Sequence, residues 1–310
     1  MFNIKGEPFT THILRTEVLK DALIGQVKQH VSAQAAKYQK RPHLAVIHVG
    51  EHAASKVYIG RKEEACRACG IDFQQITLPV SATQAQLNHE IEKLNENKDV
   101  TGIIVQMPLP EHMSPFETFN TILPYKDVDG LNAQNSGRVV MGLTEKTLYP
   151  ATPLGVLRIL DWISCDLKGK DAVMVGRSHL VGRPMADLLG AREATVMVCH
   201  KETKSVREHT KKADVVVVAT GVPHLLKGDD FKKGAVIIDV GISPSHIPER
   251  HILGDVNTES CVGIASFITP VPGGVGPMTV TSLMTNVVDA FCLQHGEKEV
   301  TWQIPAFDAK

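Results

Sequence analysis

Short apolar runs alternate with longer amphipathic segments along most of the chain, and this alternation limits the possible folds more than any other feature. Strands that are separated by helices favour parallel sheets with helices on both faces. We expect strands at residues 44–50, 73–79, 101–107, 171–176, 194–200, 214–220 and 235–241. We expect helices at residues 16–38, 53–69, 82–95, 152–164 and 279–295.

The alternation stops near the middle of the chain and then restarts, which predicts two doubly wound α/β domains with a cleft between them. A chain of 310 residues is long enough for two domains. The Gly- and Asn-rich stretch at residues 129–138 is the expected join. The expected parts are a first domain at 1–131, a second at 132–278, a helix at 279–295 that packs back on the first domain, and a loosely ordered tail at 296–310.

Charge and composition exclude several classes of protein. Lys and Arg number 33 against 34 Asp and Glu, so the balance favours neither nucleic acid nor a membrane as a partner. No apolar run approaches the roughly 20 residues that span a bilayer, and the first 20 residues lack the apolar core of a secretion signal. We therefore expect a cytoplasmic enzyme.

Six cysteines are scattered through the chain, which is not the dense spacing of a disulfide scaffold. Cys66 and Cys69 form a CxxC, but they fall in a helical run and have no second Cys or Cys/His pair at zinc spacing. We expect free structural thiols and no metal site.

A phosphate-binding turn is expected in the second half, in the stretch VMVGRSHLVGRPMADLL. Gly176 follows a strand, and Gly182 precedes a helix with Pro184 in its first turn. Such glycines let the backbone approach a ligand, and the helix N-terminus supplies amide donors and a positive dipole. The glycines are six apart, so the motif is not GxGxxG and an ordinary strand-to-helix turn is the alternative.

The residues that end the next strand favour NADP over NAD. An NAD site usually has an acidic residue at this point for the ribose hydroxyl. Here the strand ends in His200, Lys201 and Glu202. Lys201 and Arg177 suit a 2′-phosphate, whereas Glu202 suits NAD, and His200 is expected to be a packed strand-end residue.

The stretch SKVYIGRK places Ser55, Tyr58 and Lys62 on one face of a helix. An isolated YxxxK is most often an exposed helix face. Short-chain dehydrogenases also use a YxxxK, but they place it after the glycine-rich loop and have their serine about a dozen residues before the tyrosine. The order and the spacing here are different, which excludes that class.

Six distinctive motifs follow one another along the chain between residues 49 and 279. They are VGEHAASKVYIGRK, GIIVQMPLP, PYKDVDGLN, PATPLG, VGRSHLVGRP and TPVPGGVGPMT. Together they closely resemble the bifunctional methylenetetrahydrofolate dehydrogenase/cyclohydrolase family. The resemblance implies a first domain that binds folate and a second, Rossmann-like domain that binds NADP.

The resemblance also implies roles for individual residues. Lys62 would be the catalytic lysine, Tyr58 would stack on the folate, Gln106 would orient Lys62, and Asp129 would bind the pterin ring. The alternatives are a polar strand end for Gln106 and a turn-forming Asp for Asp129. Further residues of the folate pocket would be Ser55, Val105, Met107, Pro272, Gly273, Gly274, Val275 and Gly276. The cofactor would be held by Gly176, Arg177, Ser178, Lys201, Ile242 and Thr279.

The implied activity is the NADP-dependent oxidation of 5,10-methylenetetrahydrofolate, followed by hydrolysis to 10-formyltetrahydrofolate for one-carbon metabolism and purine biosynthesis. A homodimer is implied as well. The rival hypotheses are a dehydrogenase without the hydrolase step and a non-catalytic dinucleotide-binding protein. The chain departs from the family at Ala151, where cysteine is common, and at Lys201, where serine is common.

Overall fold

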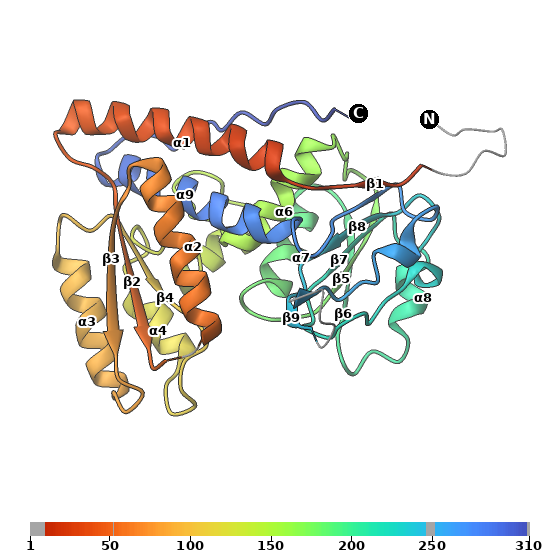
Figure 1. The fold of residues 1–310 in the computed structure, drawn as a ribbon, viewed down its shortest axis with the longest axis horizontal. Helices are drawn as coiled ribbons and strands as arrows, with labels where there is room; N and C mark the ends of the chain where they lie inside the picture. The colour runs from red at the N-terminus through yellow and green to blue at the C-terminus, as the bar shows by residue number, and fades with distance from the viewer. Residues whose placement is uncertain (1–9, 52, 246–251, 309–310) are drawn as a thin grey trace. The chain divides into compact units, whose positions relative to one another are not determined.

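The computed structural model describes residues 10–51, 53–245 and 252–308. The chain forms two compact units, each assembled from separate stretches. The three-stranded unit comprises Lys20–Leu154 and Thr279–Ile304, and the six-stranded unit comprises Gly155–Met278 with the described residues before Lys20 and after Ile304 (Figure 1). The prediction of an α/β fold built on parallel sheets is confirmed.

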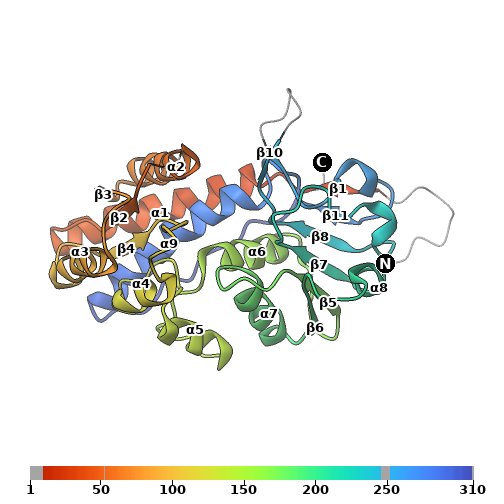
Figure 2. The ribbon, with the colours of Figure 1, turned by 90° about the horizontal axis from the view of Figure 1, so that it is seen from below.

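The three-stranded unit has a parallel sheet in the order β3-β2-β4. Its strands are β2 (His43–Val49), β3 (Asp72–Leu78) and β4 (Gly102–Val105). Successive residues of β2 enter two different cores: Leu44 and Val46 pack with α1 (Glu17–Tyr38), α2 (Ala53–Cys69) and α9 (Val275–Gln294). Ala45 and Ile47 pack with α3 (Gln84–Glu96). Both faces of the sheet are therefore covered, as the continuous apolar strands predict (Figure 2).

Side-chain caps start several helices of this unit. Thr83 forms a capping box with Gln86 at the start of α3. Ser114 accepts a hydrogen bond from the backbone of Glu117 at the start of α4 (Pro115–Thr121).

The six-stranded sheet is parallel throughout and has the order β1-β11-β8-β7-β5-β6. The strands are β1 (His12–Ile13), β5 (Asp171–Val175), β6 (Thr195–Cys199), β7 (Val215–Val218), β8 (Val236–Asp239) and β11 (Phe267–Ile268). The chain leaves β5 toward β6 on one side and then returns to β7 on the other side. The order of strands therefore reverses between β5 and β7, where doubly wound sheets bind ligands at the carboxyl ends of their strands.

Shorter elements complete this unit. The helices are α6 (Ala151–Trp162), α7 (Gly182–Ala191) and α8 (Val206–Thr210), and the part of α6 from Gly155 onward belongs to this unit. The 3₁₀ turns are η1 (Gly228–Asp230) and η2 (Glu259–Cys261). Strands β9 (Ser243–Pro244) and β10 (Ile252–Leu253) form an antiparallel pair. Valines and isoleucines of β5, β7 and β8 share one core with Phe231 and Ile268.

Three segments differ from the sequence-based expectation. The expected join at residues 129–138 contains a helix, α5 (Ala133–Val140), because the side chain of Asn132 accepts from the backbone of Gln134 and starts it. The Gly/Pro loop expected at residues 270–277 is shorter, since α9 already begins at Val275.

The tail expected to be loosely ordered is instead anchored over its described part. The carboxylate of Asp289 on α9 accepts from the backbone of Val300 at 2.9 Å and from the indole of Trp302 at 3.1 Å. Gln303 pairs with Gln26 on α1, and Val300 and Trp302 pack against the core. Apolar side chains at these two positions explain the order.

Candidate active site

Lys62 and Gln106 meet at the carboxyl end of the three-stranded sheet. Lys62 lies on α2, and Gln106 directly follows β4, where its backbone N–H donates to Ile47. The Nζ of Lys62 donates to Oε1 of Gln106 at 2.8 Å. Nε2 of Gln106 donates to the carbonyl of Met107 at 2.8 Å, so the amide is held with its oxygen toward the lysine.

The surroundings of Lys62 favour the neutral amine more than water does. Burial lowers the pKa of Lys62, and the nearby carboxylate of Asp129 opposes this effect. Burial raises the pKa of Asp129, and Lys62 opposes that effect in turn. The two groups therefore lie close enough to influence each other's charge.

Asp127 and Asp129 lie in one segment but differ in their bonding. Oδ2 of Asp127 accepts from the backbone of Asn132 and from the side chain of Asn135, both at 2.8 Å. Among the described residues, no donor is hydrogen-bonded to the carboxylate of Asp129. Asp127 therefore ties this segment to Asn132 and Asn135, whereas the carboxylate of Asp129 takes no part in these bonds.

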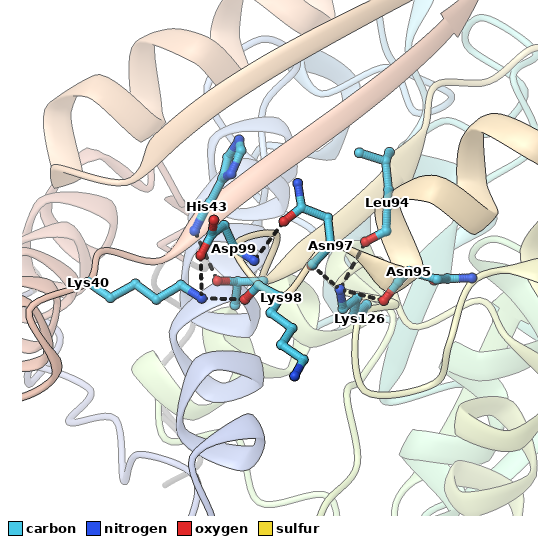
Figure 3. A network of polar contacts seen from close by, with 9 residues as sticks. Lys40, His43, Leu94, Asn95, Asn97, Lys98, Asp99 and Lys126 are labelled. Atoms are coloured by element: carbon cyan, nitrogen blue, oxygen red, sulfur yellow. Dashed lines mark hydrogen bonds and ion pairs between the residues drawn. The ribbon is translucent and has the colours of Figure 1, made fainter.

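Lys126 anchors the start of this segment. Its side chain is buried, and its Nζ donates to the carbonyls of Leu94, Asn95 and Asn97 at 2.9, 2.9 and 2.7 Å, as Figure 3 shows. Those carbonyls lie at the C-terminal end of α3, where an ammonium group compensates unpaired acceptors and the helix dipole. Burial lowers the pKa of Lys126 to about 8.

Asn286 and Gly130 fix the other side of Asp129. The side chain of Asn286 on α9 is buried and donates to the carbonyls of Val128 and Tyr149, both at 2.8 Å. Gly130 has a φ of +69°, and a Cβ there would lie 2.5 Å from the backbone of Pro150. The backbone on both sides of Asp129 is therefore held in place. Sequence analysis missed Lys126, Asp127 and Asn286, because these side chains support the site rather than line it.

Two other residues of the expected folate pocket lie on α2. Ser55 is buried, and Tyr58 is partly exposed with the guanidinium of Arg61 5.8 Å from its ring centre. Val105 is buried at the end of β4, and Met107 is partly exposed. Tyr58 and Lys62 lie one helical turn apart on α2, and the hydrogen bond of the Lys62 amine goes to Gln106 rather than to Tyr58.

The six-stranded unit has a tight turn at the point where its strand order reverses. Gly176 has a φ of +124°, and a Cβ there would lie 2.3 Å from the carbonyl oxygen of Ala219 after β7. A Cβ at Gly182 would lie 2.4 Å from the carbonyl oxygen of Gly176. Only glycine fits at either position. The turn between them leads from β5 directly into the N-terminus of α7.

Ser178 lies inside this turn, where its hydroxyl accepts from the backbone of Val181 at 3.2 Å and of Gly182 at 3.3 Å. Arg177 is exposed. After β6, Lys201 and Glu202 are exposed and lie 3.7 Å apart as an ion pair. His200 accepts from the backbone of Glu202 and has a role in the local turn.

The remaining expected ligands lie in both units. Ile242 is exposed after β8, and Pro272 is exposed in the turn before α9. Gly273 lies against Arg15, and Gly274 accepts from the hydroxyl of Thr16 at 2.8 Å. Thr279 belongs to the three-stranded unit, where its hydroxyl donates to Thr152 at 3.1 Å.

Comparison with known proteins identifies both halves of the chain. The catalytic domain of tetrahydrofolate dehydrogenase/cyclohydrolase matches residues 14–129. The NAD(P)-binding domain of the same enzymes matches residues 150–295. The chain belongs to the tetrahydrofolate dehydrogenase/cyclohydrolase family.

Members of this family resemble the chain over most of its length. The bifunctional protein FolD of Methanosarcina mazei is 44% identical over 282 residues, which cover 91% of this chain and 96% of the relative. FolD of Moorella thermoacetica is 44% identical over 265 residues, which cover 86% of this chain and 93% of the relative.

Solved structures agree. The FolD dehydrogenase/cyclohydrolase of Campylobacter jejuni has 40% identity and a TM-score of 0.87, with 90% of this chain and 98% of that chain covered. The Trypanosoma brucei enzyme, solved with NADP and an inhibitor, has 33% identity and a TM-score of 0.88, with 91% and 97% covered.

Ala151, at the position where we expected a departure from the family, is buried in the core with Ile59 and Cys66. Cys66 is buried beside Met284, and all six cysteines are free. Within the described ranges, no three His, Cys, Asp or Glu side chains are grouped so that they could hold a metal ion. None of the helices in those ranges has the length and apolar character to cross a membrane.

Proposed function

We propose that this chain oxidises 5,10-methylenetetrahydrofolate to 5,10-methenyltetrahydrofolate with NADP and then hydrolyses the product to 10-formyltetrahydrofolate. The observation that carries this proposal is the 2.8 Å hydrogen bond between Lys62 and Gln106 beside the unbonded carboxylate of Asp129. A chain with only the dehydrogenase activity would need no amine whose pKa is lowered. A non-catalytic dinucleotide-binding protein would need none of these three residues.

The turn between Gly176 and Gly182 fits a dinucleotide, because two glycines let the chain turn tightly between β5 and the N-terminus of α7, where backbone amides and the helix dipole favour a phosphate. Arg177, Ser178, Lys201, Ile242 and Thr279 are the other proposed cofactor ligands. When bound, the cofactor accepts a hydride from the bridging carbon of the folate, which leaves the methenyl cation. The protein's contribution to this step is to orient the partners and to stabilise the cation.

We assign binding of the pterin to Asp129 and Tyr58. A carboxylate accepts two hydrogen bonds from the amino-pyrimidinone edge of the ring, and the tyrosine offers a flat surface for stacking. Ser55, Val105, Met107 and the segment Pro272, Gly273, Gly274, Val275 and Gly276 are the proposed remainder of the folate pocket.

Lys62 is the proposed proton carrier of the hydrolysis. Water adds to the methenyl carbon and loses a proton, which leaves a hydroxyl on that carbon. The ring C–N bond then breaks as its nitrogen gains a proton and the hydroxyl loses one, which forms the formyl C=O. An amine can take and return a proton near neutral pH only if its pKa is well below that of free lysine. The lowered pKa of Lys62 supports this role, and Gln106 directs the amine.

The experiment is to supply methylenetetrahydrofolate and NADP and to follow the methenyl and formyl products together. Formation of both products is expected. Methenyl product alone would support the dehydrogenase without hydrolase activity, and neither product would overturn the proposal.

We further propose that the protein is a cytoplasmic homodimer whose product donates one-carbon units, including those for purine biosynthesis. The resemblance to the family supports these points. Light scattering of the purified protein tests the dimer, and a purine requirement in cells that lack the protein tests the pathway.

A further inference from the structure

Two buried aspartates lie at the carboxyl edge of the six-stranded sheet. Asp239 ends β8 and is 1% exposed, and Asp255 follows β10 and is 0% exposed. In the described part of the chain, neither carboxylate is paired with a cation. Because buried carboxylates without a counter-charge are costly, their presence requires an explanation.

Asp255 joins the loops that follow β7 and β8. Its Oδ2 accepts from the backbone of Thr220 at 2.5 Å, from the hydroxyl of Thr220 at 2.9 Å and from the backbone of Gly221 at 3.1 Å. Its Oδ1 has no hydrogen-bond partner among the described residues. This oxygen faces Gly241, where a Cβ would lie only 2.2 Å from it.

Asp239 holds Asp255 in this position. Oδ1 of Asp239 accepts from the backbone of Gly241 at 2.9 Å and of Asp255 at 3.0 Å, and its Oδ2 accepts from Val256 at 2.8 Å. The backbone of Asp239 donates to the hydroxyl of Thr269 at 2.8 Å, next to the Gly/Pro segment. Burial raises the pKa of Asp239 to about 7, with a smaller effect in the same direction from Asp255.

We propose that Asp255 is a positioning residue for the cofactor, which fixes the loop at Thr220 and Gly221 against the loop at Gly241 and Ile242. The inference rests on the proposed function, because these loops follow two strands at the ligand-binding edge of the sheet. Asp239 and Thr269 extend the same network to the segment before Pro272. Because Oδ2 of Asp255 is placed among three donors, Oδ1 is left without a hydrogen-bond partner in the described part of the chain.

The test compares Asp255→Ala with Asp255→Asn in the full chain. Asp255→Ala removes the acceptor, so we expect the KM for NADP to rise at least about tenfold, which corresponds to about 1.4 kcal/mol. Cyclohydrolase activity on supplied methenyltetrahydrofolate should stay within about twofold of wild type. Asp255→Asn should restore the KM for NADP, because its amide oxygen can replace Oδ2 and its NH₂ group can take the place of the oxygen that accepts no bond.

Gly241→Ala gives a second route to the same result, because its methyl group would displace Asp255 and leave the carboxylate intact. This variant decides the question if Asp255→Ala does not fold. The control is Asp230→Ala in the same unit, where a buried carboxylate accepts from Lys227 and pairs with Arg207. It should lower the melting temperature and leave the KM for NADP unchanged.

The inference is overturned if neither Asp255→Ala nor Gly241→Ala raises the KM for NADP more than Asp230→Ala does. It is also overturned if both activities fall together in these variants. Absence of NADP-dependent oxidation in the wild-type protein would contradict the proposed function itself, and this outcome is distinct from the other two.

Discussion

The amine of Lys62 donates to the amide oxygen of Gln106 at 2.8 Å, although 44 residues separate them along the chain. The amide nitrogen of Gln106 is bonded to the carbonyl of Met107, and this second bond sets which end of the amide faces the lysine. The amide oxygen of Gln106 can therefore accept a hydrogen bond from the Lys62 amine. Its NH₂ group, which is bonded to Met107, does not donate to that amine. This polarity fits an amine that must pick up a proton and release it again.

Replacement of Lys62 by methionine should remove the hydrolysis and spare the oxidation. Cyclohydrolase activity should fall by about 100-fold or more, which is the usual contribution of a general acid or base. Dehydrogenase activity should remain measurable, because hydride transfer needs no proton carrier. Lys56→Met on the same helix is the control, since Lys56 is exposed and pairs with Glu51. Wild-type rates for both reactions in Lys62→Met would contradict the role of the lysine.

Gln106→Glu should move the cyclohydrolase to higher pH. A carboxylate at this position favours the ammonium form and raises the pKa of Lys62. The neutral amine then appears only at a higher pH, so the limb of the pH–rate profile that requires this form should shift upward. The measurement is kcat/KM for methenyltetrahydrofolate across pH, with wild type alongside. An unchanged pH–rate profile would mean that this limb reflects the titration of a group other than Lys62.

Asp129→Asn should weaken folate binding in both reactions. A hydrogen bond to a charged group contributes about 1.5 to 3 kcal/mol, so the KM for either folate substrate should rise about 10- to 100-fold. Asp99→Asn serves as the matched control. Asp99 is exposed and lies just before β4, whereas Gln106 lies just after it. Steady-state kinetics at saturating NADP makes the comparison. Equal KM values for Asp129→Asn and wild type would rule out the proposed pterin contact.

Lys201→Ala should reduce the preference for NADP. Lys201 is exposed, and its ion pair with Glu202 at 3.7 Å is open to solvent, so loss of a phosphate contact should cost about 1 kcal/mol. The KM for NADP should rise about fivefold, and the KM for NAD should stay nearly constant. Initial rates with the two cofactors at equal concentration provide the measurement. A wild-type protein that prefers NAD would show that Glu202, and not Lys201, determines the cofactor.

The seven expected strands correspond to β2 to β8. Five of them, β2, β4, β5, β7 and β8, are apolar runs that are buried over nearly their whole length, which is the pattern of strands covered on both faces. β3 and β6 are more exposed. The two-residue strands β1 and β11 carry no such pattern, since two residues have no period. Helix α5 was missed because its Gly- and Asn-rich sequence has a low helix propensity, and the cap at Asn132 outweighs it.

The functional residues were found only where a motif names them. Lys62 and Gln106 were expected to interact, and the structure places them in direct contact. The supports of Asp129 were not found, because Asn286 lies 158 residues away from Val128. A side chain that bonds to a distant carbonyl leaves no periodic signal. Asp255 was missed for the same reason, since all three of its donors lie on a loop after another strand.

The bonds from Asn286 to Val128 and Tyr149 also bear on how the protein is made. The backbone that carries Asp129 is synthesised long before α9, which supplies the amide that fixes it. The strands and helices of the first half can therefore form while translation continues, but the carboxylate acquires its final position only after α9 has left the ribosome. A nascent chain that stops before Asn286 would contain Lys62, Gln106 and Asp129 and would still lack the two bonds that hold the backbone beside Asp129.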